Sequence, residues 1–296
     1  MDSIVKLAIG LLLALFSLSV IAADLIKVNA MNYPAWVVRN YETLALQPGS
    51  HLQQDDLLRT GKGGHLLLQL ADGSAVKLGE SARFIIESTR LADSQGDSLL
   101  ESSFQVLRGA FRFTSSFFKT TALGHRADVK IGAISAGIRG TDIWGRSNLE
   151  QDLVCLIEGL LSVEAEGEIA VTLDQALSFY VKPKGEAALP VDQIDMQKLQ
   201  TWANETELDV SLGIATERGE WQLVLISLTD LISAEKVLKS YHEKGFAARR
   251  ISVLRQGRNL HRLLLPGFVS IEAALNARTQ VREQLGINDA WVWKAN

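Results

Sequence analysis

Short runs of alternating apolar and polar residues, separated by turn residues, dominate the first two thirds of the chain. One run is GGHLLLQLADGSAVKLGESARFIIES, in which Asp72 and Gly73 form a hairpin signal. The pattern recurs in SSFQVLRGAFRFTSS, in ADVKIGAISAGIRGTDIWGRS and in LVCLIEGLLSVEA. Turns about every ten residues leave room for strands but not for long helices. This region predicts an all-β sandwich, roll or barrel, whereas PAWVVRNYETLAL before it fits either a short helix or a strand.

The N-terminus has the layout of a secretory signal peptide. The run LAIGLLLALFSLSV is uncharged and almost wholly apolar, and Ala22 and Ala23 supply the small residues of a cleavage site. The run is shorter than the roughly 20 residues that span a bilayer comfortably. We expect cleavage after Ala22 or Ala23 and an exported chain with no membrane span. An uncleaved segment would instead anchor the chain to the membrane.

Charge divides the remaining chain into two parts. Residues 24–218 contain 18 basic and 26 acidic residues, a net charge of −8. Residues 219–296 contain 11 basic and 7 acidic residues, a net charge of +4. Parts with such different electrostatic character are expected to meet different partners.

A linker separates the two parts. Pro183, Gly185 and Pro190 give its start a loop composition, and apolar residues then recur at helical spacing up to Leu208. We expect one helix of about four turns here, with Trp202 anchoring it to the preceding β domain. The predicted organisation is a signal peptide (1–23), a β domain (24–182), a linker with a helix (183–218) and a second domain (219–296).

Strand-like and helix-like segments alternate along residues 219–296. WQLVLISL is typical of a strand, and DLISAEKVLKSYHEKGF follows as an amphipathic helix that ends at Gly245. Two strands, a helix over SIEAALNARTQVREQLG and the strand DAWVWK complete a β-α-β-β-α-β order. This order is typical of a ferredoxin-like α+β domain, in which two helices cover one face of an antiparallel sheet. The other face is expected to be free.

The free sheet face is the candidate binding site. If Leu223, Leu225, Leu263 and Leu265 face the helices, alternation assigns to the free face Gln222, Val224, Ile226, Arg262 and Leu264. Trp291 and Trp293 share one face of the last strand. Tryptophan rings pack on the apolar C–H faces of sugars, and arginine donates paired hydrogen bonds to carboxylates. Two alternatives stay open: the tryptophans lie in the core under the helices, or the apolar side chains mark a protein-binding face.

The first part resembles a FecR-type periplasmic domain over about residues 44–181. The segment LQPGSHLQQDDLLRTGKGGHLLLQLADGSAVKLGESARFII resembles the opening of that family, and AISAGIRGTDIWGR contains its IRGT segment at residues 138–141. The chain departs from the family at Gln54-Asp55, where the family has a glycine before the aspartate. The resemblance implies a periplasmic domain that recognises a protein or another ligand.

The glycine-rich segment SAGIRGTDIWGR has two interpretations. In the structural one, Gly137 and Gly140 let the chain bend between strands, and Thr141 bonds its own backbone. Arg139 and Asp142 then pair with each other or bond nearby carbonyls. The alternative is a ligand contact through Arg139.

The second part resembles a SPOR domain, a peptidoglycan-binding module, over about residues 219–295. WQLVLISL matches the family's first strand, with Ser227 at its serine, and HRLLLPGFVSIEAA matches its second half, with Arg262 at its arginine. Ile226 and Leu228 replace a glycine and a phenylalanine of the family. The resemblance implies binding to peptidoglycan glycan strands in the envelope of a Gram-negative bacterium, as in cell division. The expected glycan-binding residues are Gln222, Val224, Ser227, Arg262, Trp291 and Trp293.

The sequence offers no catalytic or cofactor-binding signature. No nucleophile stands beside a base, and the 5 histidines lack the spacing of metal ligands, so we expect no enzyme activity, cofactor or metal. Cys155 lies in the apolar run DLVCLIEG and is expected to be buried and unreactive. Export argues against nucleic-acid binding, despite the basic second part.

These observations predict a non-catalytic protein of the periplasm. Its second domain would bind peptidoglycan, and its β domain would bind an unknown envelope protein or a ligand. The alternative is a FecR-like sensor whose C-terminal domain binds protein rather than glycan. A direct anti-sigma role is disfavoured, because only about six residues precede the apolar segment.

The first testable prediction concerns the N-terminus. We expect the exported protein to begin at Ala23 or Asp24, because the small residues of the cleavage site end there. N-terminal sequencing of protein taken from the periplasmic fraction measures this directly. Recovery in the membrane fraction of a chain that still begins at Met1 would replace cleavage by a membrane anchor.

Overall fold

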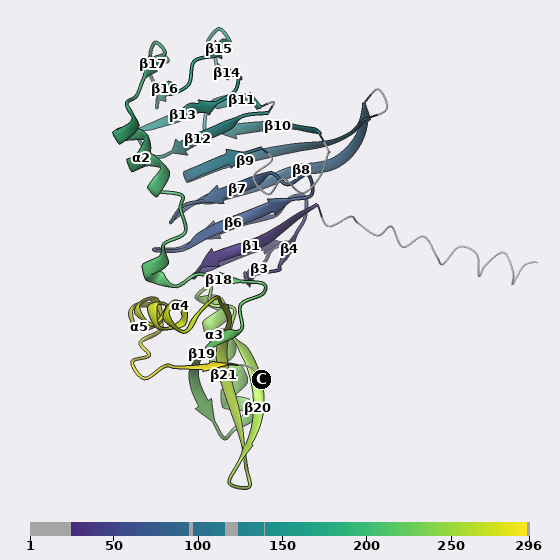
Figure 1. The fold of residues 1–296 in the computed structure, drawn as a ribbon, viewed down its shortest axis with the longest axis vertical. Coiled ribbons are helices and arrows are strands. Elements are labelled where there is room, and N and C mark those ends of the chain that lie inside the picture. Colours follow the sequence, from purple (N-terminus) through teal and green to yellow (C-terminus); the bar gives the residue numbers. More distant parts are fainter. Residues whose placement is uncertain (1–24, 95–96, 116–123, 139, 295–296) are drawn as a thin grey trace, which may run out of the picture.

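The computed structural model describes residues 25–94, 97–115, 124–138 and 140–294 (Figure 1). The expected signal peptide at residues 1–23 and the candidate ligand contact Arg139 lie outside these residues. Most of the described chain is antiparallel β-sheet with few helices, as the alternating pattern predicts. The helices within these ranges are all too short or too polar to cross a membrane.

Two β-sheets form the first part of the molecule. The strands of the first sheet, in spatial order, are β1 (Ile26–Asn32), β6 (His65–Leu70), β7 (Ala75–Leu78), the second half of β9 (Asp97–Thr114), β12 (Asp142–Ser147), β13 (Gln151–Glu158), β16 (Ser178–Pro183) and β17 (Asp192–Gln193). Those of the second are β3 (Glu42–Ala45), β2 (Ala35–Arg39), β5 (Leu57–Thr60), β8 (Arg83–Ser94), the first half of β9, β10 (Gly124–Ile131), β11 (Ile134–Ile138), β14 (Leu161–Ala165) and β15 (Val171–Leu173). The short strand β4 (His51–Leu52) pairs with the start of β1. We call these two sheets together the body.

Strand β9 belongs to both sheets and joins them. Its residues up to Val106 pair with β8 and β10, and those from Gly109 pair with β7 and β12. Gly109 adopts a φ of 88°, and a Cβ atom there would lie 2.7 Å from the Cα atom of Ala82. Only glycine meets both conditions, so the change of sheet is fixed at this residue.

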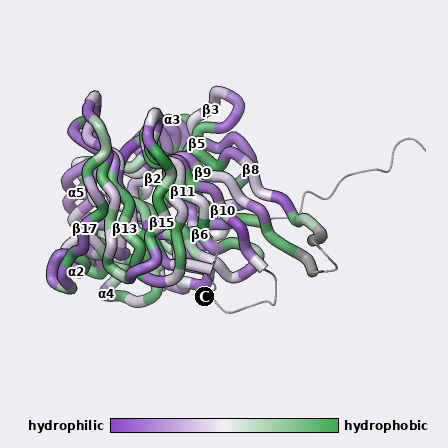
Figure 2. Tube along the Cα trace, turned by 90° about the horizontal axis from the view of Figure 1, so that it is seen from above, coloured by the Kyte–Doolittle hydropathy of each residue, from purple (hydrophilic) through white to green (hydrophobic). Residues whose placement is uncertain are grey.

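The core of the body lies between the two sheets. Alternate residues of each strand point inward, and the largest of them are fully buried, among them Phe84, Phe104, Phe111 and Phe113. In Figure 2 hydrophobic and hydrophilic segments alternate along the strands, and the β8–β9 hairpin extends away from the rest of the body.

A second sheet system follows in the C-terminal part. Its elements are β19 (Trp221–Leu228), α3 (Leu231–Glu243), β20 (Arg249–Arg255), β21 (Arg258–Phe268), α4 (Ile271–Asn276), α5 (Arg278–Leu285) and β22 (Trp291–Lys294). The strands lie in the order β20-β21-β19-β22, and every neighbouring pair is antiparallel. We call this unit the C-terminal sheet. The helix expected after Ser270 is divided into α4 and α5 at Ala277.

The linker lies along the outer face of the first sheet. Its helix α2 (Met196–Asn204) begins after Asp195, whose side chain accepts a hydrogen bond from the backbone of Lys198. Trp202 is buried and stacks on Trp144 of β12 with ring centroids 5.0 Å apart, which confirms its predicted anchoring role. The helix has 9 residues and is shorter than expected.

Ion pairs continue this attachment beyond α2. Glu205 accepts from Arg146 at 2.8 Å, and Glu207 pairs with Lys77 at 2.6 Å. The backbone at Glu205 also passes close to the backbone of the first sheet at Gly79, because a Cβ atom on Gly79 would lie 2.2 Å from the carbonyl oxygen of Glu205. Residues 195–213, here called the connecting segment, are therefore held along much of their length.

The buried side chain of Asn32 fixes the end of the connecting segment. Its Nδ2 donates to the carbonyl oxygens of Asp209 and Gly213, both at 2.9 Å. Its Oδ1 accepts from the backbone N–H of Asp209, also at 2.9 Å. Asn32 is 0% exposed, so its side-chain amide forms these three hydrogen bonds to the backbone in a place that solvent does not reach.

The body and the C-terminal sheet share strands and core. Strand β18 (Ala215–Thr216) pairs with β1 on one side and with β21 on the other. Tyr33 stacks on Phe246 with ring centroids 5.9 Å apart, and one cluster of buried apolar residues runs through both parts. Because the core is continuous, it does not mark the domain boundaries at residues 182 and 219, which stay a prediction.

A fragment of residues 216–296 tests that division. We expect it to unfold cooperatively, but at a lower temperature than the same part of the full chain, because separation exposes Phe246 and Phe268 to water. Thermal denaturation followed by circular dichroism measures both midpoints. An NMR spectrum typical of an unfolded chain would contradict independent folding.

Replacing Asn32 tests the attachment of the connecting segment. Asn32→Ala should lower the free energy of unfolding by about 2 kcal/mol or more, because it leaves three backbone groups unpaired. Chemical denaturation measures this change. The control is Asn29→Ala on the same strand, whose half-buried side chain bonds Gln69 alone among the described residues and should matter by about 0.5 kcal/mol or less. Equal losses in the two variants would contradict the proposed role of Asn32.

Candidate functional site

The C-terminal sheet has one face packed on helices and one face without them. Leu223, Leu225, Leu263 and Leu265 are buried in the same cluster as Ala234 and Val281 of the helices. Directly opposed residues of antiparallel strands point to the same face, so the register defines the other side. The side chains of this free face are Gln222, Val224, Ser227, Arg249, Ile251, Val253, Arg255, Arg258, Leu260, Arg262, Leu264, Trp291 and Trp293.

A β-bulge in β19 changes one expected position. Val224 lies opposite Leu264, but Ile226 lies opposite Leu263, so Leu225 is an extra residue in the strand. Beyond the bulge the faces exchange: Ile226 packs against the core, and Ser227 reaches the free face opposite Arg262. The expectation that Ile226 lies on the free face is therefore wrong. Simple alternation in WQLVLISL gives no sign of the bulge.

Arg262 lies against both tryptophans of the last strand. Its Cζ atom is 6.0 Å from the ring centroid of Trp291 and 5.9 Å from that of Trp293. Such contacts are favourable, because the negative face of an aromatic ring attracts a cation. Trp291 is 40% exposed, so the alternative of two tryptophans buried under the helices is wrong.

Two apolar residues of the free face are buried beside these large side chains. Val224 is 0% exposed and Leu264 is 2% exposed, and Trp291 and Leu264 both lie opposite Val224. The expected exposed patch of Val224, Ile226 and Leu264 is therefore absent from this described face. Val224 supports the aromatic side chains rather than presenting its own surface.

Two buried polar atoms on the free face lack a partner within the described chain. They are Nε of Arg262, a hydrogen-bond donor, and Oε1 of Gln222, an acceptor. Gln222 lies opposite Trp293, so both atoms belong to the same part of the sheet. None of the residues that the register places on this face is acidic. The arrangement can stack on a sugar ring, donate to an anion and accept from a hydroxyl or amide.

The register also adds residues that the sequence analysis did not assign. Arg249 lies opposite Leu264, Ile251 opposite Arg262, and Arg255 opposite Arg258. The available signal was the alternation in AARRISVLRQG, which becomes informative only once its pairing with β21 is known.

The glycine-rich segment of the body is a strand connection. Gly140 lies between β11 and β12 with a φ of 65°, as the structural interpretation expects. Gly137 lies inside β11 and is not among the residues with positive φ. Asp142 pairs with Arg112 at 2.7 Å, and Thr141 Oγ1 is buried without a partner in the described chain. The expected bond of Thr141 to its own backbone is therefore wrong, whereas the expected pair of Arg139 with Asp142 involves a residue outside the described ranges.

The body contains one serine, histidine and aspartate cluster. Ser74 and His125 both bond the carboxylate of Asp72, and the Ser74 hydroxyl also approaches Nδ1 of His125. Burial acts to raise the pKa of Asp72, but the hydrogen bond and charge of His125 and the hydrogen bonds from Ser74 together outweigh it, so this pKa lies below its usual value. The three side chains are nearly fully buried, and the cluster ties a hairpin turn to β10.

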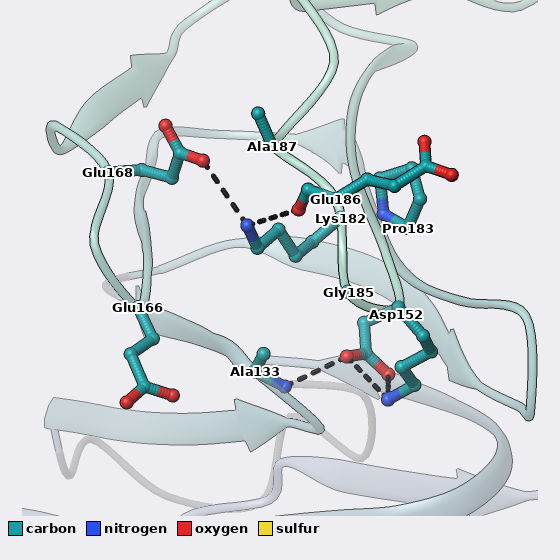
Figure 3. Close-up of a pocket in the computed structure, with 10 residues that line it drawn as sticks. Ala133, Asp152, Glu166, Glu168, Lys182, Pro183, Gly185, Glu186 and Ala187 are labelled. Carbon is teal, nitrogen blue, oxygen red and sulfur yellow. Dashed lines mark hydrogen bonds and ion pairs between the residues drawn. The ribbon is translucent and has the colours of Figure 1, made fainter.

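Several other reactive or charged groups of the body have structural roles. Burial raises the pKa of Cys155 to about 12, in agreement with its expected inertness. Figure 3 shows the pocket beside Asp152, which is 0% exposed and pairs with Lys184 at 2.6 Å. In the same pocket Lys182 pairs with Glu168 at 3.2 Å. Within the described ranges no three side chains of His, Cys, Asp or Glu gather as metal ligands would.

Comparison with protein families places two domains on the chain. The model of the FecR protein family matches residues 56–162, and the model of the SPOR domain matches residues 217–294. Both resemblances stated from the sequence are confirmed, in the expected order. No curated protein matches the chain in sequence.

Solved structures give a more distant similarity. Two crystal structures of a protein from Parabacteroides distasonis, described as a "putative anti-sigma factor", share 14% sequence identity with the chain. The match covers 81% of this chain and 99% of that one, with TM-scores of 0.38 and 0.39.

Proposed function

Because the chain carries a FecR domain followed by a SPOR domain, we propose that it is a non-catalytic protein of the bacterial periplasm. Its C-terminal sheet has a ferredoxin-like arrangement and binds peptidoglycan glycan strands through the free face. Its FecR body recognises an envelope protein. The two families support this division of roles, and no catalytic arrangement among the described residues competes with it.

The observation that carries the glycan proposal is the contact of Arg262 with Trp291 and Trp293. The rings offer apolar surface to the C–H faces of sugars, and the guanidinium retains donors for a carboxylate. Gln222 adds an unpartnered acceptor beside them. Glycan strands carry hydroxyl, amide and carboxylate groups, so each of these features has a counterpart in the ligand.

The absence of acidic residues from the free face favours the same ligand. Arg249, Arg255, Arg258 and Arg262 lie on it, and no described carboxylate forms an ion pair with them. Hydrolysis of the amide bond to the stem peptide leaves a free lactyl carboxylate on each muramyl sugar of the glycan strand. We therefore expect such stripped strands to be bound.

The variant Arg262→Ala with Trp293→Ala tests this site. It should weaken binding to peptidoglycan sacculi by at least about tenfold, which corresponds to about 1.4 kcal/mol. One lost charge-assisted hydrogen bond, at about 1.5–3 kcal/mol, is sufficient for that effect. Co-sedimentation with sacculi, before and after an amidase removes the stem peptides, measures it.

The control variant is Arg282→Ala on helix α5. This arginine is exposed and lies on the helix side of the sheet, so its removal should leave sacculus binding unchanged. Circular dichroism must show that both variants remain folded. Unchanged binding by the folded double variant, or no binding by the parent protein, would overturn the glycan proposal and favour a protein ligand for this face.

A further inference from the structure

Three arginines of the FecR body stand in one row on the outer face of the second sheet. Arg59 of β5 lies directly opposite Arg83 of β8, which lies directly opposite Arg108 of β9. Trp36 of β2 continues the row on the other side of Arg59, and the Cζ atom of Arg59 is 5.6 Å from its ring centroid. Arg83 and Arg108 are exposed, and Arg59 is half-buried. We call these residues the arginine row.

The arginine row differs in its pairing from four other arginines of the body. Ion pairs to carboxylates hold Arg39, Arg90, Arg112 and Arg146, at distances of 2.6 to 2.8 Å. The three arginines of the row have no such partner within the described chain, although acidic residues outnumber basic ones over residues 24–218.

Like charges directly opposite each other on neighbouring strands destabilise a sheet. The row contains two such pairs side by side, Arg59 with Arg83 and Arg83 with Arg108. A bound anion would remove this repulsion, so the row has the charge pattern of a binding surface rather than of a stabilising network.

An apolar row lies next to the arginine row on the same face. Val38 lies opposite Leu57, and Leu57 lies opposite Ile85, each two residues along its strand from a member of the arginine row. All three are half-buried, although they point away from the core of the body. Leu107, the extra residue beside Arg108, is 42% exposed. Arginine and aromatic residues beside apolar ones are the composition of protein interfaces.

We propose that these two rows bind an amphipathic, acidic helix of a partner protein. A helix advances about 5.4 Å per turn, and neighbouring strands lie about 4.8 Å apart, so successive turns meet successive strands. The apolar stripe of the helix lies on the apolar row, and its carboxylates pair with the arginine row. A free anion or a glycan leaves the apolar row uncovered. This inference rests on the proposed recognition of a protein by the FecR body and is independent of glycan binding.

A pair of synthetic peptides tests the inference on the full mature chain. One is a short helical peptide with a leucine stripe flanked by glutamates, and the other has glutamines in place of the glutamates. Fluorescence anisotropy should show that the glutamate peptide binds at least about tenfold more tightly than the glutamine peptide. Its affinity should fall as salt is added, because the ion pairs are at the surface.

Variants of the arginine row complete the test. Arg83→Gln with Arg108→Gln should weaken binding of the glutamate peptide by about tenfold. The control, Arg218→Gln with Arg282→Gln, removes two exposed arginines outside the row and should bind as the parent does. The row variant should also melt no lower than the parent, because it relieves a repulsion between like charges.

The outcomes separate this inference from the proposed function. Sacculus binding should be unchanged in the row variant. Peptide binding is measured without glycan, so a parent protein that fails to bind sacculi would contradict the glycan proposal and leave this inference standing. Equal affinity of parent and row variant, equal affinity for both peptides, or no binding of either peptide to the parent would overturn the inference.

Discussion

The position of the C-terminal sheet depends on one buried amide, that of Asn32. Its three hydrogen bonds bring Asp209 and Gly213 to the end of β1. Two residues later the chain enters β18, which pairs with β1 and with β21. Burying polar groups is unfavourable unless they find partners, so few other paths of the connecting segment satisfy this amide. The same contact therefore fixes both the route of the linker and the sheet that follows it.

The molecule uses its arginines in two ways. Arg39, Arg90, Arg112 and Arg146 of the body form ion pairs that tie strands to each other or to the connecting segment, as Arg146 does with Glu205. Arg262 and the arginine row lack carboxylate partners in the described chain. Two of these arginines lie beside tryptophan rings, Arg262 beside Trp291 and Trp293, and Arg59 beside Trp36. These cations lie on two different sheet faces, one in each part of the molecule. A ligand on one face therefore leaves the other open, which suits a protein that binds the cell wall and a partner together.

Much of the architecture could be predicted because the signals are local. Alternation predicted the strands of the body, and the FecR and SPOR resemblances were carried by residues close together in sequence. Trp202 and Cys155 were placed correctly, since a large or apolar side chain in an apolar pattern has few alternatives to burial. Ile226 was misplaced, because one extra residue at Leu225 exchanges the faces of a strand without changing its composition. The partner of Asp142 was missed because Arg112 lies thirty residues away along the chain and one strand away in space.

The sequence by itself determined most of the segments that form strands and helices, the order of the two domains and the chemical type of the candidate glycan site. These follow from periodicity and residue type, which act over a few residues. Only the tertiary structure decided that Arg262 stands against two tryptophans, that Val224 lies beneath them, and that Arg59, Arg83 and Arg108 form one row. Those arrangements depend on which residues face each other across strands. Cross-strand register joins residues far apart in the chain, and a shift of one position moves each side chain to the opposite face.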